Sequence, residues 1–508
     1  MLRLLLFFEC LGRPFIETNH TNYREKNMSK RITILGAGPG GYVAALHAAQ
    51  LGAQVTVIEN DNLGGTCLNW GCIPTKTMKS SAEAIRKVQG LSDYGIELIG
   101  RVRPDFQAIM KRKDRVVTSL VGGIAKAFKA GKIQLITGTG KIVDPHLVQV
   151  TDIGGDTHEV SGDCLILATG SRPQDLPNIQ FDGTTILSSN DILNLEQMPK
   201  RIVILGGGVI GVEFAFIFKH LGSQVTVVEA LDRLIPLPSI DADMSKTLMR
   251  EMKKSKIGVH LNTTIEAIET DTGGGIRTTM GPSPFEGPSP KSATKQKVLE
   301  ADALFLTVGR APNSDDIGLR RMGIAMDERG WVRADEKMET NIKDVYAIGD
   351  VLGPSKIMLA HVASMEGLVA VENCLGAGRS MDYRAVPSGI YTFPEVADVG
   401  LTQQEAEAAG IDHRSVTFLF RELGMSHAKG ELSGQIKMVS ERKSGRILGV
   451  HIIGEHATEL IAEAVLAIQT GLRAHDLAQT IHAHPTLTEG LWETARLASM
   501  PGEISVAS

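Results

Sequence analysis

One short pattern occurs twice in this chain of 508 residues, and it restricts the possible folds more than any other feature. The first copy runs from Arg31 to Gly41 and the second from Arg201 to Gly211. Each copy reads as a β-branched strand, a Gly-x-Gly-x-x-Gly loop and a helix, followed by a second strand that ends in an acid. The repeat predicts an α/β protein with two similar nucleotide-binding halves.

The glycine loops are suited to a pyrophosphate. Glycine lets the backbone turn sharply and approach a ligand, the helix N-terminus offers free N–H groups, and the terminal acid accepts hydrogen bonds from a ribose. We therefore expect two Rossmann-like dinucleotide-binding domains, since ligand-free glycine turns would not repeat strand, helix and acid at matched spacing. The predicted contacts are Gly36, Gly38, Gly41 and Glu59 in the first copy and Gly206, Gly208, Ile210, Gly211 and Glu229 in the second.

Two cysteines, Cys67 and Cys72, follow the first copy. Positions i and i+5 of an ideal helix lie farther apart than a disulfide prefers, so a bridge requires the backbone to leave helical geometry, which Gly64, Gly65 and Gly71 allow. So short a loop would stabilise the fold little. We interpret the pair as redox-active; the alternative is two ordinary buried cysteines.

A thiol pair must exchange electrons with another group, most simply a flavin. The first copy is therefore predicted to bind FAD and the second a nicotinamide dinucleotide. Glu229 suits the free hydroxyls of NAD and would repel the extra phosphate of NADP, although Arg233 lies nearby.

Composition sets the remaining limits. Hydrophobic residues make up 43% and charged residues 22%, with a formal net charge of -5, which is typical of a globular protein without affinity for nucleic acid. No apolar stretch is long enough for a bilayer, and five cysteines form no secreted-type framework, so we expect a cytoplasmic protein without membrane contact and without a metal site.

The predicted domains follow from these signals. Residues 28–172 and 306–378 form an FAD-binding domain, residues 173–305 an NAD-binding domain with a loop insertion at about 272–297, and residues 384–508 a C-terminal α+β dimerisation domain. Residues 1–27 are interpreted as a disordered extension or a start-site artefact, with a cleaved targeting peptide as the alternative. A buried strand is expected over 301–310 and another over 341–350. In the C-terminal domain we expect strands over 435–439 and 447–453 and a helix from about 457 to 470.

Near the C-terminus, His482 and His484 precede Pro485 and Glu489. A carboxylate beside a histidine orients the imidazole and raises its basicity, and dithiol chemistry needs such a base. The alternative is two satisfied polar residues in a turn.

Through the motifs at 64–76 and 482–489, the chain resembles the pyridine nucleotide-disulfide oxidoreductases from about Arg31 to Pro501. The resemblance is strongest to members that oxidise protein-bound dihydrolipoamide to lipoamide with NAD⁺. It implies a homodimer and a partner that carries a lipoyl domain, either in a 2-oxoacid dehydrogenase complex or in the glycine cleavage system.

The resemblance also implies roles for the reacting residues. Cys67 would exchange with substrate sulfur, and Cys72 would lie against the flavin as the charge-transfer thiolate. Lys76 would pair with Glu213 near the flavin N5. His484, oriented by Glu489, would reach the cysteines from the partner subunit. The remaining predicted cofactor contacts are Gly65, Thr66, Lys76, Thr169, Gly170, Ser171, Gly309, Arg310, Gly349, Asp350, Met358, Leu359, Ala360 and His361.

Two alternatives remain. The chain could be an NAD(P)H-dependent reductase of another disulfide such as glutathione. It could instead serve mainly as a binding subunit that helps to assemble a multienzyme complex.

Overall fold

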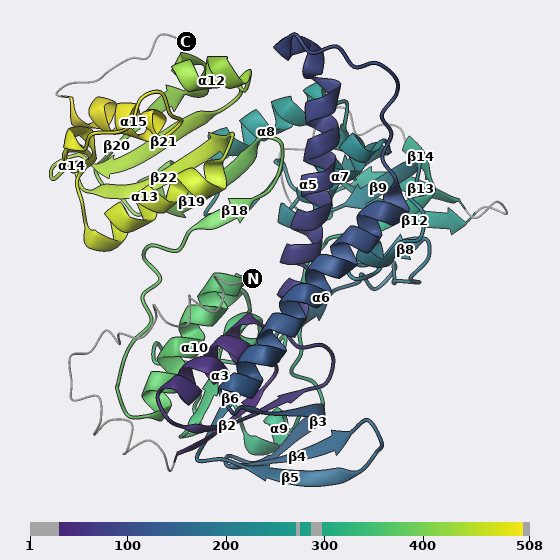
Figure 1. Cartoon of the computed structure of the whole chain (residues 1–508), viewed down its shortest axis with the longest axis vertical. Helices are drawn as coiled ribbons and strands as arrows, with labels where there is room; N and C mark the ends of the chain where they lie inside the picture. Colours follow the sequence, from purple (N-terminus) through teal and green to yellow (C-terminus); the bar gives the residue numbers. More distant parts are fainter. Residues whose placement is uncertain (1–29, 271–274, 286–296, 501–508) are drawn as a thin grey trace. The chain divides into compact units, whose positions relative to one another are not determined.

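The structure is a computed structural model that describes residues 30–270, 275–285 and 297–500. The predicted extension at 1–27 lies outside the described residues. The chain forms two compact units (Figure 1). Among the described residues, the first unit comprises 30–69, 119–172 and 312–381, and the second comprises 70–118, 173–270, 275–285, 297–311 and 382–500. These units do not separate the three predicted domains one by one, so that division stays a prediction.

The first unit is built on a seven-stranded sheet in the order β17-β6-β1-β2-β3-β4-β5. Strands from β17 to β3 run parallel, and β3, β4 and β5 form an antiparallel meander. The central strands β6 and β1 are buried over nearly their whole length, because both faces of a parallel sheet are covered. The strands are β1 (Arg31–Leu35), β2 (Gln54–Glu59), β3 (Gln134–Asp144), β4 (Leu147–Asp152), β5 (Thr157–Ser161), β6 (Cys164–Leu167) and β17 (Val345–Ala347).

Helices α3 and α10 of the first unit pack directly on each other. Their backbones approach closely at Gly40 and Gly367, where a Cβ on Gly367 would lie 2.8 Å from the Gly40 carbonyl oxygen. A larger residue at Gly367 would therefore push the helices apart. The helices assigned to this unit are α3 (Pro39–Gln50), α4 (Gly65–Asn69), α9 (Leu319–Met322), η3 (Gly349–Ser355) and α10 (Ala360–Cys374), while α6 (Phe106–Ala130) contains the boundary between the units.

The second unit repeats the core of this arrangement in a five-stranded parallel sheet, in the order β11-β10-β9-β15-β8, in which β11-β10-β9-β15 corresponds to β3-β2-β1-β6. In β1 and β2, Arg31 aligns with Gln54, and in β9 and β10, Arg201 aligns with Gln224. The repeat predicted from the sequence is therefore confirmed. The elements are α5 (Cys72–Gln89), η1 (Leu91–Tyr94), β8 (Ile186–Leu187), η2 (Asp191–Asn194), β9 (Arg201–Leu205), α7 (Val209–Leu221), β10 (Gln224–Val228), α8 (Ala242–Lys254), β11 (Gly258–His260) and β15 (Ala303–Leu306).

The prediction of a loop at 272–297 is wrong for part of that segment. Residues 276–282 form β13, which lies between β12 (Thr263–Thr270) and β14 (Lys297–Ala301) in an antiparallel sheet. Ile276, Thr278 and Met280 alternate inward along this strand, a period that the surrounding Gly, Ser and Pro residues masked. Residues 272–274 and 286–296 lie outside the described residues.

Two other expected strands are shorter than predicted. The strand expected over 301–310 is β15 followed, after Gly309 at φ +133°, by β16 (Arg310–Pro312), which pairs with β7 (Ser171–Pro173). The strand expected over 341–350 contains only β17, and Gly349 at φ +71° turns the chain into η3. In both places a glycine with positive φ ends the extended backbone.

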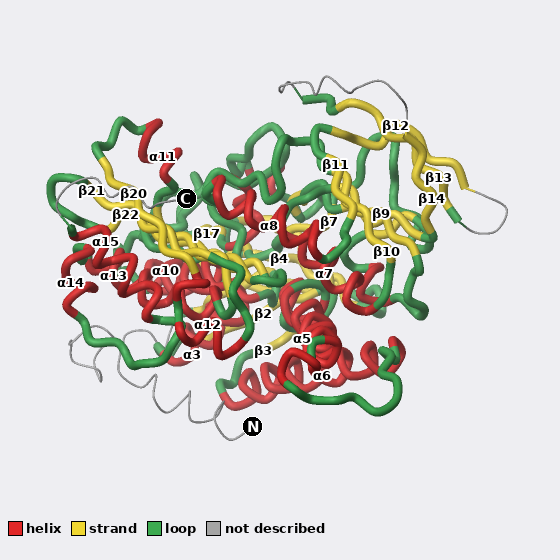
Figure 2. The backbone as a smooth tube through the Cα atoms, turned by 90° about the horizontal axis from the view of Figure 1, so that it is seen from above, coloured by secondary structure: helices red, strands yellow, loops and turns green. Residues whose placement is uncertain are grey.

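The C-terminal part of the second unit is an antiparallel sheet in the order β18-β19-β22-β21-β20, with α13 and α15 packed on it (Figure 2). The expected helix at 457–470 and the strands near 435 and 447 are confirmed. The elements are β18 (Ser388–Ile390), β19 (Glu395–Gly400), α11 (Gln403–Ala408), β20 (His413–Leu419), η4 (Phe420–Glu422), α12 (Gly424–Lys429), β21 (Gln435–Glu441), β22 (Ile447–Gly454), α13 (Ala457–Thr470), α14 (Ala474–Gln479) and α15 (Glu489–Ser499).

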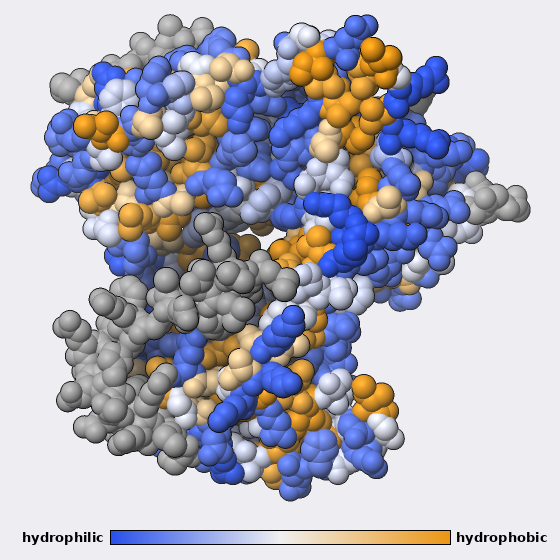
Figure 3. Space-filling view, in the orientation of Figure 1, coloured by the Kyte–Doolittle hydropathy of each residue, from blue (hydrophilic) through white to orange (hydrophobic). Residues whose placement is uncertain are grey.

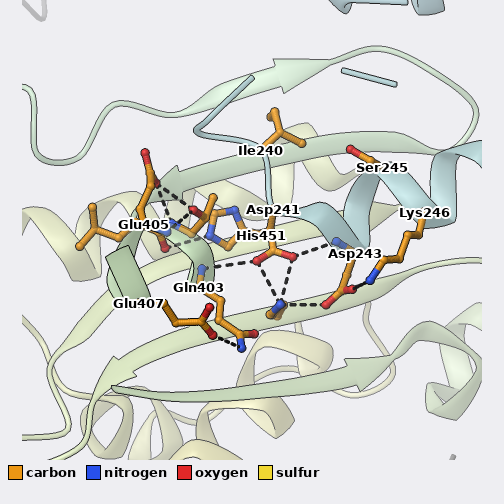
Figure 4. Close-up of polar contacts among 12 residues, drawn as sticks. Ile240, Asp241, Asp243, Ser245, Lys246, Gln403, Glu405, Glu407 and His451 are labelled. Carbon is orange, nitrogen blue, oxygen red and sulfur yellow. Dashed lines mark hydrogen bonds and ion pairs between the residues drawn. The ribbon is translucent and has the colours of Figure 1, made fainter. Parts of the chain in front are cut away.

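A buried ion cluster joins α8 to this sheet (Figure 4). The Lys437 ammonium lies 3.0 Å from the Asp241 carboxylate and 2.8 Å from that of Asp243, while Asp241 also caps α8 by accepting the N–H of Asp243. Loss of the Lys437 ammonium would leave the buried Asp241 carboxylate without its counter-charge, which costs about 3–5 kcal/mol. The cluster therefore fixes the nucleotide-binding sheet against the C-terminal sheet within the second unit.

The segment between α5 and α6 exposes a group of apolar side chains (Figure 3). They are Tyr94, Ile96, Leu98, Ile99 and Val102. Across the described ranges, no helix combines the length and the apolar character needed to span a membrane.

Candidate functional site

The helical geometry is interrupted between the two cysteines, as expected. Cys67 lies in the short helix α4, and Cys72 is the first residue of α5. The intervening Gly71 has φ -149° and ψ -110°, outside helical geometry. Cys72 is exposed and lies at a helix N-terminus, where the positive end of the helix dipole stabilises a thiolate.

Lys76 lies one turn further along α5, on the same face as Cys72, and interacts electrostatically with it. Its ammonium contacts both carboxylate oxygens of Glu213, at 2.9 and 2.8 Å. Burial opposes the charge on Lys76, but the Glu213 carboxylate outweighs that effect and raises the pKa of Lys76. The predicted ion pair is thus present, and Lys76 stays charged at neutral pH.

Glu213 requires such a partner because α7 is apolar on nearly every side. Most of its residues are buried, and the Glu213 side chain is only 5% exposed. A carboxylate in these surroundings is costly unless it is paired and hydrogen-bonded. The backbone N–H of Tyr391 donates a further hydrogen bond of 2.9 Å to Glu213 Oε1.

His484 and Glu489 form the second predicted pair. His484 Nδ1 lies 2.8 Å from Glu489 Oε1, and Glu489 Oε2 accepts the N–H of Thr486 at 2.9 Å. The Thr486 N–H and then the His484 contact lower the pKa of Glu489, so its carboxylate is ionised at neutral pH. An Nδ1–H that donates to this carboxylate leaves Nε2 as a proton acceptor on a side chain that is 78% exposed.

His482 is placed differently. Its Nε2 contacts Glu463 at 3.0 Å, its Nδ1 lies 3.0 Å from the Thr480 carbonyl oxygen, and its side chain is 8% exposed. Both ring nitrogens therefore have partners. Of the two neighbouring histidines, only His484 combines an orienting carboxylate with an exposed ring.

The glycine loop of the first unit has the close contacts that a dinucleotide site requires. Gly36 has φ +105°, and a Cβ there would lie 2.3 Å from the Ala168 carbonyl oxygen. Glu59, at the end of β2, accepts the N–H of Ala37 at 2.6 Å and so closes the loop onto the neighbouring strand. Burial raises the pKa of Glu59, although its backbone hydrogen bonds act in the opposite direction.

Further groups of the first unit fit a bound flavin dinucleotide. Thr169 Oγ1 is buried without a hydrogen-bond partner among the described residues, as expected for a group that a ligand satisfies. Ser171 Oγ donates to Asp350 at 2.7 Å. The buried Glu366, which the sequence did not single out, accepts the N–H of Gly349 at 2.6 Å and holds the turn that presents Asp350.

The glycine loop of the second unit is equally tight at one end and open at the other. A Cβ on Gly206 would lie 2.5 Å from the Thr307 carbonyl oxygen, whereas a Cβ on Gly208 would meet nothing within 4 Å. Glu229 accepts hydrogen bonds from the N–H groups of Gly207 and Leu231. The loop therefore fits a dinucleotide that approaches on the Gly208 side.

The contacts of Arg233 do not suit the binding of the extra phosphate of NADP. Its guanidinium donates to the carbonyl oxygens of Ile240 and Leu237, at 2.8 Å each, and to Ser245 Oγ at 3.0 Å. These contacts hold Arg233 in its own loop, which supports the preference for NAD inferred from Glu229.

The structure places the other predicted contacts at the ends of the strands or at helix starts. Gly41 lies in α3 and Ile210 and Gly211 in α7, while Met358 and Leu359 directly precede α10. The remaining positions are Gly38 before α3, Gly65 and Thr66 in α4, Gly170 after β6, Gly309 before β16, Arg310 in β16, and Ala360 and His361 in the first turn of α10. Their individual contacts to cofactors stay predictions.

Comparison with known protein families defines the class. The model of the pyridine nucleotide-disulphide oxidoreductase family matches residues 30–367, and the dimerisation domain of that family matches residues 386–495. The chain therefore belongs to the pyridine nucleotide-disulphide oxidoreductases. Members of this family are flavoprotein disulfide oxidoreductases that use FAD and NAD, so the predicted fold class, activity class and cofactors are confirmed. The dimerisation domain supports the predicted homodimer.

Comparison with individual proteins is more specific than the family match. The dihydrolipoyl dehydrogenase of Chlamydia muridarum is 40% identical over 467 residues, which cover 92% of this chain and 96% of that protein. The mitochondrial dihydrolipoyl dehydrogenase of Pisum sativum is 37% identical and covers 91% of this chain and 90% of its own. Among solved structures, LpdA from Mycobacterium tuberculosis superposes with a TM-score of 0.83 at 30% identity and covers 92% of this chain and 99% of its own. The HOCl-induced flavoprotein disulfide reductase RclA from Escherichia coli gives 0.78 at 27% identity, with 92% of this chain and 99% of its own covered.

Proposed function

We propose that this chain is a dihydrolipoyl dehydrogenase that oxidises a protein-bound dihydrolipoyl group and reduces NAD⁺. The observation that carries the proposal is the exposed His484, whose Nδ1 is bound by the ionised Glu489 at 2.8 Å. A dithiol substrate must lose protons before its sulfur can attack a disulfide, and this imidazole is built to accept them. The names of the relatives support the choice of substrate.

The proposed reaction begins with two thiol–disulfide exchanges, and its electrons and protons balance. One substrate sulfur attacks the Cys67–Cys72 disulfide at Cys67, and the second substrate sulfur then displaces Cys67, so the substrate loses two electrons and two protons and the cysteine pair is reduced. FAD, when bound, carries these two electrons from the cysteines to NAD⁺. The products are lipoamide, NADH and one released proton.

The chain's own residues hold the charges that this sequence needs. The N-terminus of α5 and Lys76 stabilise Cys72 as a thiolate, and Glu213 keeps Lys76 in place at 2.8 Å. His484 Nε2 accepts the substrate proton while Glu489 stabilises the imidazolium that forms. In the proposed homodimer, His484 serves the cysteines of the partner subunit.

The proposed physiological partner is a lipoyl domain of a 2-oxoacid dehydrogenase complex or of the glycine cleavage system. The similarity to dihydrolipoyl dehydrogenases supports it. The predicted cytoplasmic location belongs to the same proposal and rests on the cysteine usage of the sequence.

The test compares dihydrolipoamide with NAD⁺ or NADP⁺, and glutathione disulfide with NADH or NADPH, in steady-state assays of the purified holoenzyme. The expected result is turnover of dihydrolipoamide with NAD⁺ and a kcat/KM at least roughly 10²-fold lower for each other pair, because the charged 2′-phosphate meets Glu229 and glutathione lacks the linked dithiol. A preference for glutathione disulfide would replace the proposal with the reductase alternative.

A further inference from the structure

The connection between β18 and β19 lies on the seam between α5 and α7. Its Phe393 ring faces the Lys79 ammonium at 5.0 Å and packs against Phe216 of α7 at 6.1 Å. Its first residue, Tyr391, faces Lys76 instead, with the ammonium 4.4 Å from the ring centroid. The connection thus presents two aromatic rings to successive lysines of the same helix.

Tyr391 holds both members of the Lys76–Glu213 pair. Its backbone N–H binds Glu213 Oε1 at 2.9 Å, and its ring supplies a π-face to Lys76 Nζ. The groups that face Lys76 are therefore Glu213 from α7, Cys72 from α5 and Tyr391 from the connection. With the carboxylate on one side and the ring on another, the ammonium has a restricted position.

Tyr391 also lies beside a second polar group. Its hydroxyl is near Thr458, whose own hydroxyl donates to Glu395 at 2.7 Å. Glu395 in turn pairs with Lys79 at 3.0 Å. The hydroxyl end of the ring therefore lies beside Thr458, while the face of the ring contacts the Lys76 ammonium.

We propose that Tyr391 is a positioning residue for the disulfide chemistry. Its ring contacts the Lys76 ammonium and its backbone N–H binds Glu213, and together these contacts hold the ammonium in place relative to Cys72, one turn away on α5. A better-placed ammonium stabilises the Cys72 thiolate. This inference rests on the proposed function, in which Cys72 acts as a thiolate.

The test keeps the shape of residue 391 and changes only the ring's attraction for a cation. Phenylalanine and progressively fluorinated phenylalanines are placed at position 391 in the holoenzyme, and Tyr391→Leu removes the ring. After reduction with dithiothreitol, the pH profile of Cys72 alkylation by iodoacetamide is followed by peptide mass spectrometry. The same trifluorophenylalanine at position 393 is the matched control, because that ring faces Lys79.

Tyr391→Phe should match the wild type, whereas fluorination should move the alkylation midpoint to higher pH in steps. At neutral pH the alkylation rate should fall roughly two- to thirtyfold in Tyr391→Leu, the range expected for loss of a cation–π contact. Unchanged profiles across the fluorinated series, or an equal shift from position 393, would overturn the inference. The readout involves no lipoamide, so a shifted profile in an enzyme that does not oxidise dihydrolipoamide would contradict the proposed function alone.

Discussion

Replacement of Cys72 or Cys67 by serine should abolish dihydrolipoamide oxidation. A serine hydroxyl neither forms the disulfide nor ionises at neutral pH, so neither exchange can occur. Loss of a reacting group of this kind lowers kcat by roughly 10⁴- to 10⁶-fold. The measurement is steady-state NADH production from dihydrolipoamide by each variant.

Cys164→Ser is the matched control for these variants. Cys164 is 1% exposed in β6, and its Sγ contacts the Cys374 carbonyl oxygen at 3.7 Å, a bond that serine can also donate. The control should therefore retain turnover within about threefold. Turnover of Cys67→Ser or Cys72→Ser at more than a few per cent of the wild type would exclude that cysteine from the electron path.

Replacement of His484 by glutamine should slow dihydrolipoamide oxidation by about 10²- to 10⁴-fold, the usual contribution of a general base. Glutamine can still donate to Glu489 but cannot take the substrate proton. The loss should shrink as the assay pH rises, because the substrate thiol then ionises without help. A pH series of kcat/KM for wild type and variant measures both effects.

His482→Gln provides the comparison for this variant. His482 lies two residues away, but both of its ring nitrogens already have hydrogen-bond partners, Thr480 and Glu463. The amide of glutamine can replace one of these two bonds. Its effect should be below about tenfold and should not depend on pH in the same way. If His482→Gln slowed turnover more than His484→Gln, the assignment of the base would be reversed.

Much of the fold could be predicted from the sequence because local patterns determine it. The two glycine loops, their strands and the acids Glu59 and Glu229 follow from spacing alone, and the structure closes each loop onto its acid. The helix at 457–470 begins and ends where its apolar period does. Where local signals competed, as at 276–282 among glycines and prolines, the inward alternation of β13 was missed.

Tertiary contacts limit how much of the site can be predicted from the sequence. Lys76 and Glu213 were paired through family resemblance, and no local pattern joins residues so far apart in sequence. Tyr391 was missed because its role depends on a backbone N–H and a ring face that only the folded chain brings to that pair. The weak signal in the sequence is an aromatic residue between an apolar strand and a proline, which many core segments share.

The central claim is that a Cys72 thiolate, stabilised by the N-terminus of α5 and Lys76, is the sulfur that meets the flavin. The direct test is an anaerobic visible spectrum of the holoenzyme, recorded as NADH is added to the wild type and to the Cys72→Ser and Cys67→Ser variants. We expect a yellow protein that develops a long-wavelength charge-transfer band on reduction, a band already present in unreduced Cys67→Ser and missing from Cys72→Ser. A colourless protein that takes up no flavin, or a band that survives in Cys72→Ser, would contradict the claim.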